Sequence, residues 1–202
     1  MAGNYLRKDH FYNKAKSQGY RSRAAYKLIE LDKKHKLFKS GARVLDLGSF
    51  PGSWLQVALE RVGQTGRLLG VDLRELEPLQ GSSIELLKVF IGDAADEDLQ
   101  AEILRQSDGG FNLIMSDMSP KLSGIKFRDA VLSAELVSLA HNISRKMLKK
   151  DGALVAKIFP GSEVEEVLKS LRESFLKINR HSLKATRGSS NEFYIVAKGF
   201  LG

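Results

Sequence analysis

The chain has 202 residues, of which 43% are hydrophobic, and its 32 basic and 24 acidic residues give a formal charge of +8. This length suits one domain with a sizeable core. The absence of cysteine excludes disulfides, cysteine-ligated zinc and a cysteine nucleophile, including the thiol that methylation of cytosine C5 requires. The N-terminus lacks the apolar core of a secretory signal, and no stretch reaches the roughly 20 apolar residues of a membrane span. We therefore expect a soluble, cytoplasmic protein.

The positive charge is concentrated near the N-terminus. Residues 1–43 contain 12 basic and 3 acidic residues, a net charge of +9, whereas the remainder contains 20 basic and 21 acidic residues, a net charge of −1. A basic segment on a near-neutral domain predicts contact with a polyanion, most often nucleic acid, with a solubilising tail as the alternative. We divide the single expected domain into a basic arm and helix at 1–40 and a main part at 41–202.

Short apolar runs alternate with helical patterns along the main part of the chain. Residues 1–18 predict an arm or an irregular helix, and an amphipathic helix follows before residue 40. This alternation predicts an α/β fold, a mostly parallel seven-stranded Rossmann-like sheet with helices on both faces and an antiparallel C-terminal hairpin. The expected strands are 43–47, 67–71, 84–90, 111–116, 153–159, 177–184 and 193–198, and the expected helices of the main part are 53–62, 96–105, 130–149 and 163–175.

A glycine loop follows the first expected strand. In open α/β sheets, ligands bind beyond the carboxyl ends of the strands, and glycines let the backbone approach them closely. The loop lacks the G-x-G-x-x-G spacing of dinucleotide binding, so it favours a nucleoside without a diphosphate. The loop residues that we expect to contact this nucleoside are Gly48, Ser49, Pro51, Gly52 and Trp54.

An acidic residue follows each of the next two expected strands. Asp72 ends the second strand, where a carboxylate can accept hydrogen bonds from both ribose hydroxyls of an adenosine. Asp93 follows the third strand, near the place of an adenine amino group. Together with the glycine loop, these acids predict an S-adenosylmethionine pocket, and a nicotinamide cofactor is the alternative that the loop spacing disfavours.

Further along the chain, four residues are candidates for chemistry. Asp117 follows the fourth strand in a segment without the Asn/Asp-Pro-Pro-aromatic motif of many amine methyltransferases, which disfavours an exocyclic amine as acceptor. Lys157 interrupts an apolar run near the end of the fifth strand, although lysine is rarely buried without a partner. Glu192 stands at the start of the last strand, and we expect it near Asp117 and Lys157 if that strand is antiparallel to the others. Lys27 lies on the early helix.

Four segments together resemble the FtsJ/RrmJ family of ribose 2′-O-methyltransferases: residues 20–28, 46–54, 116–120 and 155–159. The resemblance implies a uridine ribose of large-subunit ribosomal RNA as the acceptor. A transfer-RNA ribose and a non-catalytic RNA-binding assembly factor are the alternatives. The resemblance also implies a tetrad of Lys27, Asp117, Lys157 and Glu192, with S-adenosylmethionine contacts at Gly52, Trp54, Asp72, Asp93 and Asp117.

A ribose hydroxyl is a poor nucleophile, so the reaction requires alignment with the sulfonium methyl and removal of the hydroxyl proton. We assign proton removal to Lys157. We expect Lys27 and Glu192 to position the ribose, and Asp117 to hold both the lysine and the methionine end of the cofactor. The expected partner is RNA, as ribosomal RNA or as the large subunit, contacted by a monomer without a metal ion or a membrane. The candidate RNA-binding residues are Lys14, Arg21, Arg23 and Lys121.

Overall fold

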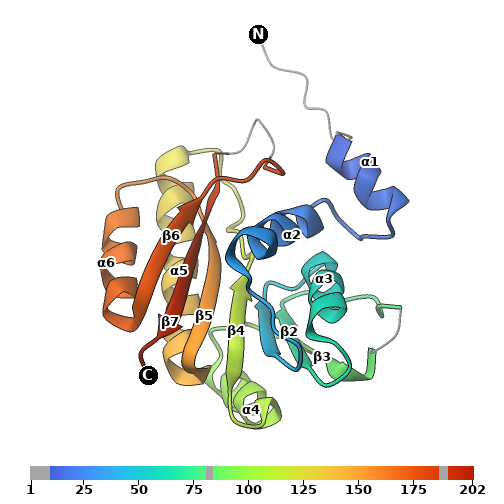
Figure 1. The fold of residues 1–202 in the computed structure, drawn as a ribbon. Coiled ribbons are helices and arrows are strands. Elements are labelled where there is room, and N and C mark those ends of the chain that lie inside the picture. The colour runs from blue at the N-terminus through green and yellow to red at the C-terminus, as the bar shows by residue number, and fades with distance from the viewer. Residues whose placement is uncertain (1–9, 81–83, 187–190) are drawn as a thin grey trace.

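The computed structural model describes residues 10–80, 84–186 and 191–202. Its seven strands form one sheet in the order β3-β2-β1-β4-β5-β7-β6 (Figure 1). The strands are β1 (Arg43–Leu47), β2 (Arg67–Asp72), β3 (Leu87–Ile91), β4 (Phe111–Ser116), β5 (Leu148–Ile158), β6 (Phe175–His181) and β7 (Phe193–Phe200). The helices are α1 (His10–Ser17), α2 (Ala24–His35), α3 (Ser53–Val62), the 3₁₀ helix η1 (Ile84–Leu86), α4 (Glu97–Ser107), α5 (Lys126–Met147) and α6 (Val164–Ser174).

The strand directions confirm the predicted Rossmann-like architecture. Strands β1 to β5 pair in parallel, whereas β7 lies between β5 and β6 and is antiparallel to both. Because β7 is reversed, it begins at the sheet edge where its neighbour β5 ends. This arrangement brings the first residues of β7 beside the carboxyl ends of the parallel strands.

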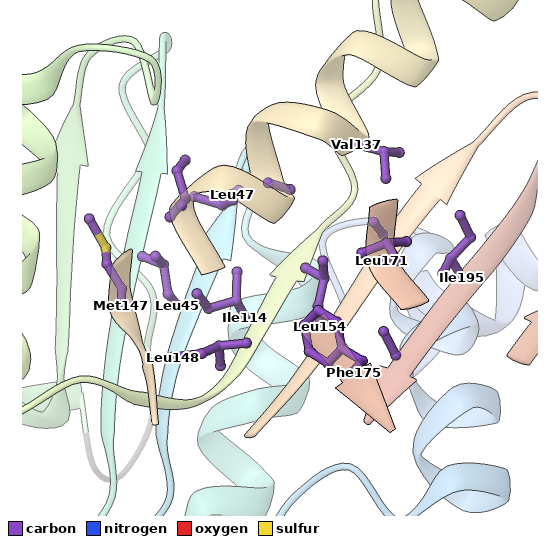
Figure 2. Packing of buried hydrophobic residues seen from close by; sticks show 14 of the residues in the cluster. Leu45, Leu47, Ile114, Val137, Met147, Leu148, Leu154, Leu171, Phe175 and Ile195 are labelled. Atoms are coloured by element: carbon purple, nitrogen blue, oxygen red, sulfur yellow. The ribbon is translucent and has the colours of Figure 1, made fainter. Parts of the chain in front are cut away.

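Helices cover both faces of the sheet, as the alternating pattern predicts. On one face, α4, α5 and α6 pack against alternate residues of the strands. Figure 2 shows Val137 of α5 and Leu171 of α6 among Ile114, Leu154 and Ile195 of the sheet. All five side chains are buried, so this face forms a continuous apolar core.

The opposite face is covered by α2 and α3. Leu28 of α2 and Leu55 of α3 share a buried cluster with Val44, Met115 and Val155 of the sheet. These strand positions alternate with those that face α5, because successive side chains of a strand point to opposite faces. The face under α2 and α3 also holds the polar residues of the candidate site.

The described part of the basic N-terminal region is helical and packs on the sheet domain. In α1, Phe11 lies 5.6 Å from the ring of Tyr26 of α2. Trp54 of α3 donates its indole N–H to the carbonyl oxygen of Ala24 at 2.8 Å, which fixes the start of α2 against α3. None of the helices in the described ranges combines the length and hydropathy needed to cross a bilayer.

Several element boundaries differ from those predicted: α5 begins at Lys126 rather than at 130, β5 begins at Leu148 rather than at 153, and β6 spans Phe175–His181 rather than 177–184. The strand expected from residue 84 begins with η1 and becomes β3 only at Leu87. The helix expected to reach residue 149 ends at Met147, and β5 starts at the next residue because Leu148 already pairs with Phe111 of β4. Gly152, predicted to follow the helix, lies inside β5, where a Cβ would come within 2.7 Å of the carbonyl oxygen of Lys149.

Candidate active site

Polar side chains of three strands gather on the face of the sheet that α2 covers. Strand alternation places Asp46 of β1 and Lys157 of β5 on this face, two residues beyond the buried Val44 and Val155. Tyr194 of β7 pairs directly with Lys157 in the sheet register. The carboxyl edge of the sheet therefore carries a cluster of polar groups beneath an apolar layer.

Lys157 and Asp117 form a buried ion pair at this edge. The Lys157 Nζ lies 3.1 Å from Asp117 Oδ1 and donates to the main-chain oxygen of Asp117 at 2.8 Å. The lysine is only 7% exposed. The hydroxyl of Tyr194 donates to the same Oδ1 at 2.7 Å, so one carboxylate holds both side chains.

Lys27 and Glu192 form a second ion pair beside the first. Lys27 Nζ contacts Glu192 Oε1, and both side chains are largely shielded from solvent. The Lys27 ammonium also lies 5.7 Å from the centre of the Tyr194 ring. Tyr194 thus links the two ion pairs, and the structure brings all four residues of the expected tetrad together from α2, β5 and the ends of β4 and β7.

The electrostatic environment keeps Asp117 ionised. Burial alone would raise the pKa of Asp117, but the positive charges of Lys157 and Lys27, with the hydrogen bonds from Tyr194 and Lys157, lower it below its usual value. The same surroundings raise the pKa of the Tyr194 hydroxyl instead. Burial, followed by the negative charges of Asp117 and Glu192, raises the pKa of Tyr194 well above 10, so it stays a donor.

Glycines shape the loop after β1. Gly48 has a φ of +76°, and a Cβ there would lie 2.8 Å from Cγ of Met118, so only glycine allows this loop to touch the segment after β4. Gly52 has a φ of +100° and is the N-cap residue of α3, which begins at Ser53. The backbone N–H groups of Gly48 and Ser49 both donate to the carbonyl oxygen of Val71, which ties the loop to β2.

Arg21 clamps this loop from the side of α2. Its guanidinium donates to the carbonyl oxygens of Pro51, at 3.0 Å, and Pro78, at 2.7 Å. The cis peptide Phe50–Pro51 lies at the turn of the loop. Arg21 therefore joins the segment before α2 to the glycine loop and to the segment that follows β2.

Asp72 and Asp93 lie at the ends of β2 and β3, as expected from their order. Asp72 accepts from the backbone N–H groups of Phe50 and Arg74, both at 2.9 Å, so its carboxylate borders the glycine loop. Asp93 accepts from the N–H of Ala95 at 2.9 Å. Because Gly92 N–H bonds the main-chain oxygen of Asp72, the ends of the two strands are adjacent.

Asp46 is a candidate site residue that was not predicted from the sequence. It is buried, and neither carboxylate oxygen has a hydrogen-bond partner among the described residues. Burial, followed by the negative charges of Asp117 and Asp72, raises its pKa well above the usual value. The signal for it was an acid inside the apolar run of β1. Three carboxylates converging beside a glycine loop fit a cofactor that carries an ammonium and a sulfonium, and S-adenosylmethionine carries both.

The remaining expected residues lie in different surroundings. Trp54 is 3% exposed, and its ring centre lies 5.8 Å from that of Tyr194. Arg23 is buried and donates to the carbonyl oxygen of Ala185, where it ties α2 to the segment after β6. Lys14 is exposed and lies over the Tyr26 ring of α2. Lys121 is exposed after β4.

Across residues 10–80, 84–186 and 191–202, no group of three or more histidine, aspartate or glutamate side chains is arranged to hold a metal ion.

A family profile and individual relatives of this chain both indicate a methyltransferase. Residues 20–200 match the profile of the FtsJ-like methyltransferase family. Ribosomal RNA large subunit methyltransferase E of Methanothermobacter thermautotrophicus is 40% identical over 97% of this chain and 92% of its own length. The protein of the same name from Hahella chejuensis is 38% identical over 96% of this chain and 92% of its own length.

Solved structures share the fold. A ribosomal RNA methyltransferase from Plasmodium falciparum matches 91% of this chain and 100% of its own at 31% identity, with a TM-score of 0.75. Aeropyrum pernix fibrillarin, solved with natively bound S-adenosylmethionine, matches 79% of this chain and 67% of its own at 16% identity, with a TM-score of 0.55, which supports the fold alone. With a family profile that covers most of the sheet domain, this chain belongs to the FtsJ-like methyltransferase family, and its cofactor is S-adenosylmethionine.

Proposed function

We infer that this chain transfers a methyl group from S-adenosylmethionine to the 2′-hydroxyl of a uridine ribose in large-subunit ribosomal RNA, with Lys157 as the general base. The observation that carries this proposal is the buried contact of Lys157 Nζ with Asp117 Oδ1, 3.1 Å apart, at the carboxyl edge of the sheet. The names of the relatives and the +9 charge of residues 1–43 support ribosomal RNA as the substrate.

The cofactor supplies an electrophilic methyl group when it is bound. Asp46, Asp72 and Asp117 would hold its cationic and ribose groups, while Gly48 and Gly52 let the backbone come close. Asp93 would lie at the adenine end. Ser49, Pro51 and Trp54 shape the pocket wall, since Trp54 and Ser49 are buried and Pro51 is held by Arg21.

Lys157 acts on the ribose hydroxyl in this proposal. To act as a base, Lys157 must first release to solvent the proton that it holds in the ion pair with Asp117. The amine then takes the proton of the ribose hydroxyl as the oxygen bonds to the methyl group, and the ammonium that this restores is stabilised by the ionised Asp117. Tyr194 keeps the carboxylate oriented through its 2.7 Å hydrogen bond. Lys27 and Glu192, already paired with each other, form the adjoining wall against which the ribose is positioned.

The RNA contacts divide by accessibility. Lys14 and Lys121 are exposed and available to phosphates. Arg21 and Arg23 are engaged with backbone carbonyls, so their first effect is to hold α2 against the glycine loop and against residue 185. We propose that the two arginines support RNA binding mainly by holding α2 in position.

The experiment that tests the proposal maps ribose methylation across ribosomal and transfer RNA in cells with and without the gene. We expect one large-subunit uridine to lose its 2′-O-methyl group and to regain it with the wild-type gene but not with Lys157→Ala. Loss of a transfer-RNA methyl group would redirect the proposal to that substrate. Loss of no site would favour a non-catalytic assembly factor.

A further inference from the structure

The segment at 121–128, made of the last residues before α5 and the first three residues of that helix, exposes three large apolar side chains within six residues. Leu122, Ile125 and Phe127 are 62%, 61% and 69% exposed, and every residue of the segment is exposed. Single exposed apolar residues are ordinary, but a local group of them beside a candidate site marks a contact surface.

The segment is held in place by a buried carboxylate. Asp129 of α5 accepts from the Ser123 N–H at 2.8 Å, from the Ser123 hydroxyl at 2.7 Å and from the Gly124 N–H at 3.2 Å. These hydrogen bonds, that from the Ser123 backbone first, lower the pKa of Asp129, so it stays ionised at neutral pH. The apolar tips are therefore presented outward by a preformed turn.

Both ends of the segment are anchored beside the tetrad. It begins four residues after Asp117. At its other end, the first turns of α5 pack on the chain that follows β5, because a Cβ at Gly161 would lie 2.7 Å from Cβ of Ala130. The Phe159 N–H also donates to the Ser133 hydroxyl at 3.0 Å. The segment thus borders the two strand ends that carry Asp117 and Lys157.

Positive charges alternate with the apolar side chains. Lys121, Lys126 and Arg128 lie in the segment, which contains no acidic residue. None of the three takes part in an ion pair within the described part of the chain. Arg128 also helps to lower the pKa of the neighbouring Asp129, after the hydrogen bonds from Ser123 and Gly124. Exposed aromatic and aliphatic groups interleaved with exposed cations match an unpaired RNA strand, which offers base faces and phosphates in alternation.

We propose that residues 121–128 form a platform for unpaired nucleotides next to the acceptor ribose, with Phe127 stacking on a base. Leu122 and Ile125 extend the apolar contact, and Lys126 and Arg128 contact the flanking phosphates. The proposal rests on the proposed function and adds to it a requirement for a single-stranded acceptor region, because a base within a duplex cannot stack on a side chain.

The test compares Phe127→Ala and Phe127→Tyr with Leu176→Ala, an equally exposed apolar residue on β6 at the far edge of the sheet. The substrates are large-subunit RNA and large subunits from cells that lack the gene, and the probes are a 12-nucleotide uridine strand and its duplex with adenosine. We expect Phe127→Ala to weaken binding of RNA and of the single strand roughly 5- to 100-fold. Phe127→Tyr and Leu176→Ala should bind like the wild type, and S-adenosylmethionine affinity should be unchanged in all three.

Salt dependence separates stacking from charge. Phe127→Ala should leave the slope of log affinity against log salt unchanged, whereas Lys126→Ala and Arg128→Ala should each lower it by about one. The platform would be overturned if Phe127→Ala bound RNA as tightly as the wild type does, or if the wild type bound the single strand and the duplex equally well. In either case, methylation by the wild type would still support the proposed function. A wild type that neither methylates nor binds RNA would overturn both.

Discussion

The two halves of the sheet's carboxyl edge differ in whether their buried charged groups have partners. In the cofactor half, formed by the ends of β1, β2 and β3, backbone groups shape the site and Asp46 is buried without a hydrogen-bond partner among the described residues. In the half that we propose to be catalytic, formed by β4, β5 and β7 and called the catalytic half below, the charges are paired: Lys157 with Asp117, and Lys27 with Glu192. The first half is suited to a cationic ligand, and the second to a fixed arrangement of its own side chains.

The largest expected effect is the loss of methyl transfer when Lys157 is removed from the catalytic half. We expect Lys157→Ala to slow methyl transfer by about 10²- to 10⁴-fold, the range for loss of a general base, because no other amine replaces it against Asp117. Single-turnover transfer to RNA measures this, and calorimetry should give an unchanged S-adenosylmethionine affinity. Lys150→Ala, at the exposed opposite end of β5, is the matched control. Normal transfer by Lys157→Ala would remove Lys157 from the mechanism.

In the cofactor half, a substitution of Asp46 should change the stability of the protein and its affinity for S-adenosylmethionine in opposite directions. Because its pKa is raised in the folded state, the unfolded chain loses this proton first as pH rises above about 4, so the buried carboxyl costs stability at neutral pH. Asp46→Asn should therefore raise the free energy of unfolding without cofactor by about 1 kcal/mol. It should also weaken S-adenosylmethionine binding about tenfold, since a charge-assisted contact is lost. Asp151→Asn, on the surface, should change neither quantity, and undiminished binding by Asp46→Asn would contradict this role.

Arg21 tests whether the basic region acts on the cofactor half directly. Arg21→Gln removes the donors to Pro51 and Pro78, so we expect the cofactor affinity to fall about three- to tenfold through loosening of the loop. Arg67→Gln, at the opposite edge of the sheet, is the control. Unchanged cofactor affinity together with weaker RNA binding and a flatter salt dependence would instead make Arg21 a phosphate contact.

The smallest effect concerns the packing of α2 against β6. Burial, then the nearby Lys34, lowers the pKa of His181 below 6.5, with Glu30 opposing. The unfolded chain therefore takes up this proton before the folded chain does, and stability is complete above pH 6.5 and falls below it. His181→Gln should reduce the loss of unfolding free energy between pH 7.5 and 5.5, measured by denaturant titration. The same change at the exposed His10 should leave the loss as in the wild type.

Much of the site was readable from local order along the chain. An acid or a glycine at the end of each of the first four expected strands was sufficient to predict a pocket at the carboxyl edge, because parallel strands end together. The exposed state of Lys14 also agrees with its polar segment. The buried positions of Arg23 and Trp54 were not readable, since they depend on the contacts of α2 with residue 185 and with α3.

The sequence by itself determined the strand and helix alternation and the charge asymmetry, since these depend on local periodicity and composition, and the expected tetrad followed from the resemblance of four segments to a known family. Only the tertiary structure decided which charges meet. The reversed β7 brings Tyr194 and Glu192 to the edge where Lys157 lies, and the packing of α2 on α3 delivers Lys27 there. Alternation along β1 places Asp46 on the same face, where it is buried and where the negative charges of Asp117 and Asp72 act on its carboxyl group.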